Sequence, residues 1–248
     1  MIIAVAVQKG GTGKTATAAT LAQAATHKGL KVLTIDLDPQ GNLSYTLGAR
    51  IAQDTGSSYK LLTGAPADQQ IQATAQGIDL IPAEWALSTI TSGRGTARRL
   101  QEALGPIRAR YDLIFIDTPP TAGILQYMAM QAADRLIIPL QADAYNLQSL
   151  YQITDTARQI QQSNPELQFA GLLLTQYDGR SLLARQMQTT IINKAQEMGV
   201  PYLGTIRAGI AVKEAAAMQQ SLYKYAPRSK PAADYMDVFH YLTHSRYI

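Results

Sequence analysis

The sequence predicts an α/β protein with a doubly wound, mostly parallel β-sheet flanked by helices. Short apolar runs alternate with longer helix-like segments along the 248 residues. The runs are rich in Val, Ile and Leu, as expected of strands that are buried on both faces. Alternating strands and helices favour parallel strands joined by helical crossovers. Strands are expected at Ile2–Val7, Val32–Ile35, Ile78–Ile81, Leu113–Ile116, Leu136–Leu140, Phe169–Leu174 and Tyr202–Ile206.

Length and composition favour a single domain that spans residues 1–248. The chain is 46% hydrophobic, which is enough to form a substantial core. It shows no internal repeat and no low-complexity linker. The segment Gly48–Gly77, which is rich in Gly, Ala, Gln and Thr, is predicted to be an irregular excursion with short helices.

Two absences narrow the possible chemistry. The chain contains no cysteine, which excludes disulfides, thiolate catalysis and cysteine-ligated clusters and fits a reducing cytoplasm. The first residues lack the pattern of a secretory signal, and no apolar run reaches membrane-spanning length. We therefore expect a cytoplasmic protein without a membrane partner.

The net charge of +4 is distributed unevenly. Residues 180–248 carry nine basic and four acidic residues, a balance of +5, whereas the remaining 13 basic and 14 acidic residues give −1. Such a distribution is what a face that binds a polyanion would produce, although the charge taken alone favours a basic surface that only confers solubility. The nine cations are Arg180, Arg185, Lys194, Arg207, Lys213, Lys224, Arg228, Lys230 and Arg246.

The segment "IIAVAVQKGGTGKTATAATLAQ" predicts a phosphate-binding loop between a strand and a helix. Backbone N–H groups and the positive end of the helix would point at one anion. Gly10, Gly11 and Gly13 allow close backbone approach to phosphate, and Lys14 can reach the β and γ phosphates. The Thr15 hydroxyl can ligate Mg²⁺. A glycine turn that merely precedes a lysine is the alternative, but the full order of elements favours nucleotide binding.

The loop carries a second lysine, Lys9, and lacks the usual first glycine because Gln8 stands in its place. In this feature the sequence resembles the deviant Walker A ATPases of the ParA/MinD group. The resemblance implies that Lys9 crosses a dimer interface and contacts the phosphates of the partner's nucleotide. A cation supplied in trans stabilises the charge that gathers on the γ phosphate in the transition state. ATP is therefore expected to assemble a homodimer.

Two further motifs agree with this resemblance. "TIDLDPQGN" places Asp36 and Asp38 at the end of a strand, with both side chains expected on one side of it. It resembles the family's Walker A′ segment, which implies that Asp38 positions the attacking water and that Asp36 lies near the metal. Two aspartates after a strand would otherwise indicate only a capped turn.

"YDLIFIDTPPTAG" is an apolar strand with Asp117 at its carboxyl tip, where ligands gather in open α/β sheets. The segment resembles Walker B. The resemblance implies that Asp117 holds Mg²⁺ through water and that Thr118–Gly123 is a switch sensing the γ phosphate. Without the resemblance, a proline-rich strand exit would mean only a turn.

The resemblance extends over nearly the whole chain, including "IIPLQADAYNLQSL", "LLLTQYDGRSLLARQ", "IRAGIAVKEA" and "YAPRSKPAADY". It implies an adenine site in the loops after Leu174 and Ile206, where Thr175 and Arg207 are the candidate contacts. The implied nucleotide-binding residues are Lys9, Gly10, Gly11, Thr12, Gly13, Lys14, Thr15, Ala16, Thr175 and Arg207; the implied metal-site residues are Thr15, Asp36 and Asp117; and the implied catalytic residues are Lys9, Lys14 and Asp38.

Within the family the sequence is most similar to the partition ATPases. The last helix-like segment, "DYMDVFHYLTHSRYI", lacks the lysine-rich face of a membrane anchor and is expected to dock on the core. The resemblance implies non-specific DNA binding, a ParB-like centromere-binding partner and association with the nucleoid. Candidate DNA contacts are Arg180, Arg207 and Lys213. A MinD-like or cargo-positioning ATPase that acts on a membrane or a protein platform is the alternative.

One stretch departs from the family pattern. Chromosomal members often carry an Ile-Pro-Arg-Asn-Val-Arg-like segment with a DNA-contacting arginine. The corresponding residues here are Ile206-Arg207-Ala208-Gly209-Ile210-Ala211, whose arginine does not align.

Overall fold

The computed structural model describes residues 1–50, 55–93, 95–143 and 145–244, and within these ranges the strands form one eight-stranded sheet. Its order is β3-β4-β2-β5-β1-β6-β7-β8, and every neighbouring pair is parallel except β3 and β4. This arrangement confirms the predicted fold class. The strands are β1 Ile2–Val5, β2 Val32–Asp36, β3 Gln72–Ala73, β4 Asp79–Ile81, β5 Leu113–Asp117, β6 Arg135–Leu140, β7 Gln168–Tyr177 and β8 Tyr202–Arg207.

All seven predicted strands are present, with shifted ends. β1 ends at Val5 rather than Val7, although the Ala6 amide still donates to the Ile137 carbonyl at 3.1 Å. The additional strand is β3, an antiparallel edge strand of only two residues. Its brevity leaves no periodic apolar pattern that the sequence could reveal.

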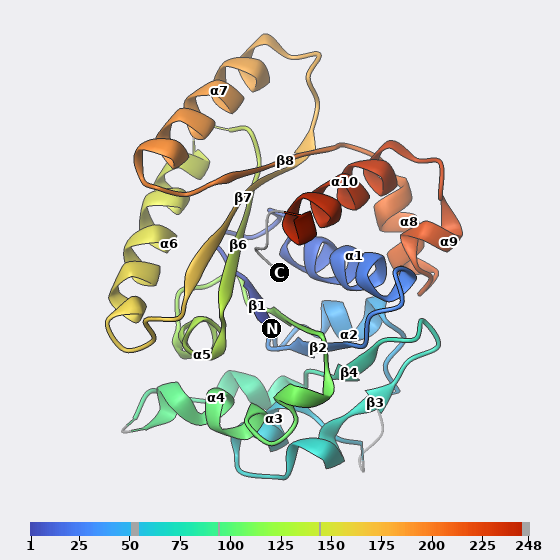
Figure 1. Cartoon of the computed structure of the whole chain (residues 1–248), viewed down its shortest axis with the longest axis vertical. Helices are drawn as coiled ribbons and strands as arrows, with labels where there is room; N and C mark the ends of the chain where they lie inside the picture. Colours follow the sequence, from blue (N-terminus) through green and yellow to red (C-terminus); the bar gives the residue numbers. More distant parts are fainter. Residues whose placement is uncertain (51–54, 94, 144, 245–248) are drawn as a thin grey trace.

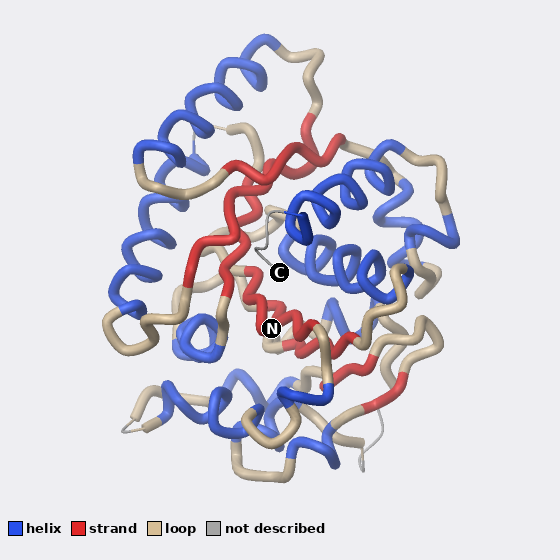
Figure 2. The backbone as a smooth tube through the Cα atoms, viewed as in Figure 1, coloured by secondary structure: helices blue, strands red, loops and turns tan. Residues whose placement is uncertain are grey.

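Helices cover both faces of the sheet (Figures 1 and 2). One hydrophobic cluster lies under α3 to α7, and a second lies under α1, α2 and α8 to α10. The α-helices are α1 Lys14–His27, α2 Asn42–Thr46, α3 Ser58–Leu62, α4 Arg99–Leu104, α5 Ile124–Ala132, α6 Tyr145–Gln161, α7 Leu182–Glu197, α8 Ala211–Ala217, α9 Leu222–Tyr225 and α10 Lys230–His244. Short 3₁₀ turns are η1 Ala67–Gln70, η2 Trp85–Thr89, η3 Thr96–Arg98 and η4 Arg108–Arg110.

Three of these helices test the expectations for the excursion and the C-terminus. α3 and η1 are the short helices expected between Gly48 and Gly77; residues 51–54 of that segment lie outside the described ranges. α10 buries Tyr235, Val238, Phe239 and Leu242 against the core, which confirms a docked final helix. No helix among the described residues is both long and apolar enough to cross a membrane.

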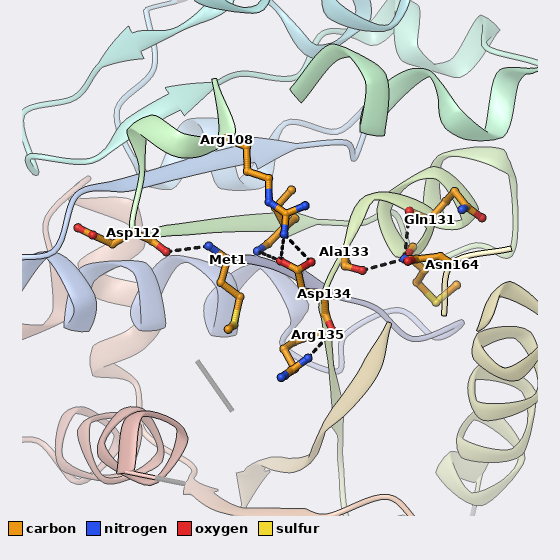
Figure 3. A network of polar contacts seen from close by, with 10 residues as sticks. Met1, Arg108, Asp112, Gln131, Ala133, Asp134, Arg135 and Asn164 are labelled. Carbon is orange, nitrogen blue, oxygen red and sulfur yellow. Dashed lines mark hydrogen bonds and ion pairs between the residues drawn. The ribbon is translucent and has the colours of Figure 1, made fainter. Parts of the chain in front are cut away.

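Polar contacts anchor the amino edge of the sheet, opposite the edge at which the predicted site lies (Figure 3). The Asp134 carboxylate accepts from the Ile2 amide at 2.7 Å and from the Arg108 guanidinium at 2.7 and 2.9 Å. These bonds tie the start of β1 to the start of β6 and to η4. Because the strands run in parallel, a fixed register here brings their carboxyl ends together at the other edge.

Candidate nucleotide-binding site

The loop between β1 and α1 has the backbone conformation of an anion-binding turn. Gly11 and Gly13 have φ angles of 75° and 85°, a left-handed region that glycine adopts without strain. α1 begins at Lys14, directly after Gly13. The amino end of a buried helix therefore points at the carboxyl edge of the sheet, where its N–H groups and dipole favour an anion.

Lys14 is held inside this loop. Its side chain is buried, and the ammonium Nζ donates to the Lys9 carbonyl oxygen at 2.8 Å. Burial lowers the pKa of Lys14, while the nearby carboxylates of Asp117 and Asp38 act in the opposite direction. The predicted phosphate cation thus lies between the loop and two acidic residues.

Neighbouring groups brace the loop and leave one donor free for a ligand. Thr175 donates from its hydroxyl to the Thr12 carbonyl at 2.6 Å, and the Gln141 and Gln176 amides donate to the Gly11 carbonyl at 3.0 and 2.7 Å. Among the described residues, the buried Thr12 hydroxyl has no hydrogen-bond partner. A buried hydroxyl needs a partner, and a phosphate oxygen in the loop would supply one.

The three predicted metal-site residues, Thr15, Asp36 and Asp117, lie together at the carboxyl edge of the sheet. The Thr15 hydroxyl donates to Asp117 Oδ2 at 2.6 Å, and Asp117 lies directly opposite Asp36 in the β2–β5 register. Burial, followed by the charge of Asp36, raises the pKa of Asp117 well above its usual value. Burial likewise raises the pKa of Asp36 to about 6. Two buried carboxylates with hard oxygen donors fit Mg²⁺, which would neutralise their mutual repulsion.

Within the described ranges, no three acidic or histidine residues gather as a complete metal cage. This agrees with the coordination of Mg²⁺ in nucleotide sites, where one or two protein oxygens are completed by phosphate and water. The fit therefore depends on Thr15 and Asp117 together with a nucleotide.

The two aspartates of the Walker A′ segment have different surroundings. The Asp36 carboxylate accepts three hydrogen bonds, from the Ser44 amide at 2.8 Å, the Ser44 hydroxyl at 2.7 Å and the Asp38 amide at 3.0 Å. Asp38 lies beyond the end of β2, accepts from the Gln40 amide at 3.0 Å and lines a cavity of about 420 Å³. Asp36 thus anchors the loop, whereas Asp38 faces open space next to the predicted switch, Thr118–Gly123.

A second cavity, of about 250 Å³, opens beside the phosphate loop. Thr175 and Arg207 both line it, as do Gly13 and Ala16. Its walls are largely apolar and include Tyr235 from α10, which suits a flat base next to the phosphates. Thr175 lies within β7 and Arg207 ends β8, so the two candidate adenine contacts line this cavity from the carboxyl ends of these strands rather than from the loops that follow them.

Lys9 is engaged within its own subunit. Its Nζ lies 3.1 and 3.2 Å from the two carboxylate oxygens of Asp143 and 5.7 Å from the centre of the Tyr145 ring. No sequence pattern indicates this contact, because Asp143 is 134 residues away and lies in a loop after β6.

The three candidate DNA contacts lie at or after the ends of β7 and β8: Arg180 follows β7, Arg207 ends β8 and Lys213 follows β8. Arg180 is almost fully exposed and pairs with Asp178 at 2.6 Å. Arg207 pairs with Asp234, a largely buried carboxylate, at 2.5 Å. Lys213 on α8 is exposed and makes no ion pair within the described part of the chain. Arg246, which contributes to the basic excess, lies outside the described residues.

The sheet order, the glycine loop before α1 and the carboxyl-edge aspartates define a P-loop nucleoside triphosphatase fold. A family model described as an AAA domain matches residues 1–169. The chromosome partitioning protein ParA of Caulobacter vibrioides is 38% identical over 233 residues, which are 90% of this chain and 86% of that protein. The sporulation initiation inhibitor protein Soj of Bacillus subtilis is 34% identical over 244 residues, 96% of each chain.

Among solved structures, a cobyrinic acid a,c-diamide synthase from Mycobacterium smegmatis with a bound ATP analogue and magnesium superposes with a TM-score of 0.84. It is 30% identical, and the match covers 99% of this chain and 95% of that one. The chain belongs to the ParA/MinD family of deviant Walker A P-loop proteins.

Proposed function

We propose that the protein is a ParA-like DNA-partition ATPase that hydrolyses ATP to ADP and phosphate with Mg²⁺. The observation that carries this proposal is the presence of two lysines, Lys9 and Lys14, on one glycine loop at the sheet edge. The family relationship and the names of its relatives, which are partition proteins over most of this chain, support the proposal.

In the proposed reaction, Lys14 and the α1 N-terminus hold the β and γ phosphates, and Thr15 and Asp117 hold Mg²⁺. Bound there, Mg²⁺ would supply positive charge that offsets the negative charge of the phosphates. Asp38, which faces the open cavity rather than the loop interior, orients the attacking water. Thr175 and Arg207 flank the base.

ATP closes a homodimer in this proposal, because Lys9 acts on the nucleotide of the second subunit. The ATP dimer then binds DNA without sequence preference through Arg180, Arg207 and Lys213, and a ParB-like centromere-binding partner stimulates hydrolysis. The protein would thereby associate with the nucleoid. Two copies of one basic surface in a dimer give avidity, which makes DNA binding depend on ATP.

The test is cosedimentation of the full chain with plasmid DNA and, separately, with anionic liposomes, each with ATP, ADP or no nucleotide. ATP-dependent recovery with DNA alone is expected. Recovery with liposomes alone would replace this proposal with the MinD-like or cargo-positioning alternative. Lys9→Ala is the matched control, because it should still bind ATP but lose ATP-dependent dimerisation and hence DNA recovery.

A further inference from the structure

A second concentration of positive charge lies on the segment Arg98–Arg110. This segment begins at the last residue of η3 and contains the whole of α4 and η4. Residues 94–110 hold five of the chain's thirteen arginines and one acidic residue, Glu102. The net charge of residues 1–179 is only −1, because acidic residues outside this segment offset its arginines. Three of these acidic residues, Asp36, Asp38 and Asp117, are at the nucleotide site. Arg94 lies outside the described residues.

Most of this charge is available to a partner. Arg98, Arg99, Arg108 and Arg110 are all exposed. Arg108 is committed to Asp134, as Figure 3 shows. In the described ranges, Arg98, Arg99 and Arg110 make neither an ion pair nor a side-chain hydrogen bond. The candidate DNA contacts Arg180, Arg207 and Lys213 are called here the C-terminal candidate surface. Both arginines of that surface are neutralised by carboxylates.

Arg99 also borders a polar hollow of about 400 Å³. The hollow is lined by hydroxyl-bearing side chains, among them Tyr59, Thr91, Ser92 and Thr96, and none of the described residues that line it bears a carboxylate. A guanidinium beside hydroxyl donors is the combination that binds phosphate oxygens. An acidic lining would instead have indicated a cation or a basic peptide.

The cluster is separate from the C-terminal candidate surface. α4 packs on α3 and α5 and covers one face of the sheet, whereas α8 and α10 lie on the opposite face (Figure 1). We propose that the Arg98–Arg110 segment is a second DNA-contact surface, in which Arg98, Arg99 and Arg110 bind phosphodiester groups of the duplex backbone. This inference rests on the proposed DNA-binding function.

The experiment measures binding of the full chain with ATP to unrelated duplexes by fluorescence anisotropy across a salt series. The test variant is Arg98→Gln/Arg99→Gln. Its matched control is Lys28→Gln/Arg50→Gln, which removes two exposed positive charges outside both basic surfaces. A charge-preserving variant, Arg98→Lys/Arg99→Lys, and thermal melting of all variants separate loss of contact from loss of folding.

The test variant is expected to bind every duplex at least several-fold more weakly at about 0.1 M salt, with a log–log salt slope shallower by roughly 0.9 per lost phosphate contact. The control and the lysine variant should retain the wild-type slope. Equal weakening in test and control variants would assign the effect to net charge and overturn the inference. An unchanged test variant would overturn it while leaving the proposed function intact.

Two remaining outcomes are also decisive. No ATP-dependent DNA binding by the wild type would overturn the proposed function and this inference together. If the test variant loses affinity for anionic vesicles of phosphatidylglycerol and phosphatidylcholine but keeps its affinity for DNA, the surface binds membrane lipid and the DNA assignment is wrong.

Discussion

Lys9 and Asp143 form an ion pair, with Nζ 3.1 Å from Oδ1 and 3.2 Å from Oδ2. The Asp143 carboxylate is itself oriented by the Asn146 amide groups, at 3.1 Å from the backbone N–H and 2.6 Å from Nδ2. If Lys9 acts on the nucleotide of a second subunit, this pair must first open. The single subunit therefore holds the Lys9 ammonium against its own Asp143 carboxylate.

Asp143→Asn should strengthen ATP-dependent dimerisation, because it removes the charge that holds Lys9 and retains an oxygen for the Asn146 amide. Partly exposed ion pairs contribute about 0.2–1 kcal/mol each, and the dimer opens one pair in each subunit, so we expect a dimer dissociation constant lower by roughly 2- to 30-fold. Sedimentation equilibrium with ATP measures it. Asp178→Asn, which breaks an ion pair elsewhere, is the control, and weaker dimerisation in Asp143→Asn would show that Asp143 is needed in the dimer itself.

Lys14→Ala should abolish ATP binding, because it removes the buried cation of the phosphate loop. A loss of at least two orders of magnitude in affinity is expected from removing a charged, largely desolvated contact, which is about 3 kcal/mol. Titration with a fluorescent ATP analogue measures this affinity. Normal affinity in a folded Lys14→Ala protein would contradict the assignment of the loop.

Asp38→Ala should bind ATP and Mg²⁺ and dimerise, but hydrolyse ATP far more slowly. Its carboxylate faces a cavity and makes one hydrogen bond, to the Gln40 amide, so its removal leaves the phosphate loop intact. Loss of a group that positions the water typically lowers the rate about 10²–10⁴-fold. Single-turnover hydrolysis of radiolabelled ATP is the measurement, and a wild-type rate would exclude this role.

A test of the proposed DNA surface requires two variants, because Arg207 also neutralises the largely buried Asp234. Arg180→Ala/Lys213→Ala should weaken binding to all duplexes alike and reduce the salt slope by roughly 0.9 per lost phosphate contact. Arg207→Ala should additionally destabilise the fold, because it leaves a buried carboxylate unpaired. Anisotropy and thermal melting distinguish the two effects. Unchanged affinity in the double variant would direct attention to Lys224, Arg228 and Lys230.

Asp134→Ala should lower the free energy of unfolding by about 1–3 kcal/mol, because the Ile2 amide loses its hydrogen-bond acceptor and Arg108 loses its ion-pair partner. Arg108→Ala should cost less, because its side chain is half exposed and the Asp134–Ile2 bond remains. Urea unfolding of both variants provides the comparison. Equal losses would indicate that the ion pair, rather than the bond to Ile2, anchors this edge.

The sequence by itself determined the sheet, the loop and the family. Its buried strands leave continuous apolar runs, and the loop residues Gly11, Gly13 and Lys14 are adjacent in the chain, so local patterns predict them. It could not predict β3, whose two residues are too few for a pattern, or the end of β1, which depends on hydrogen bonds from neighbouring strands.

Only the tertiary structure decided which charged side chains form ion pairs or hydrogen bonds and which remain exposed to solvent. Lys9 forms an ion pair with Asp143, and Arg207 forms one with Asp234. Asp36 accepts hydrogen bonds from Ser44. Only chain folding creates these contacts. The same folding leaves Arg98 and Arg99 exposed on a helix that covers the face opposite α8. Side chains far apart in sequence meet only once the strand order is fixed, because parallel strands bring all their carboxyl ends to one edge.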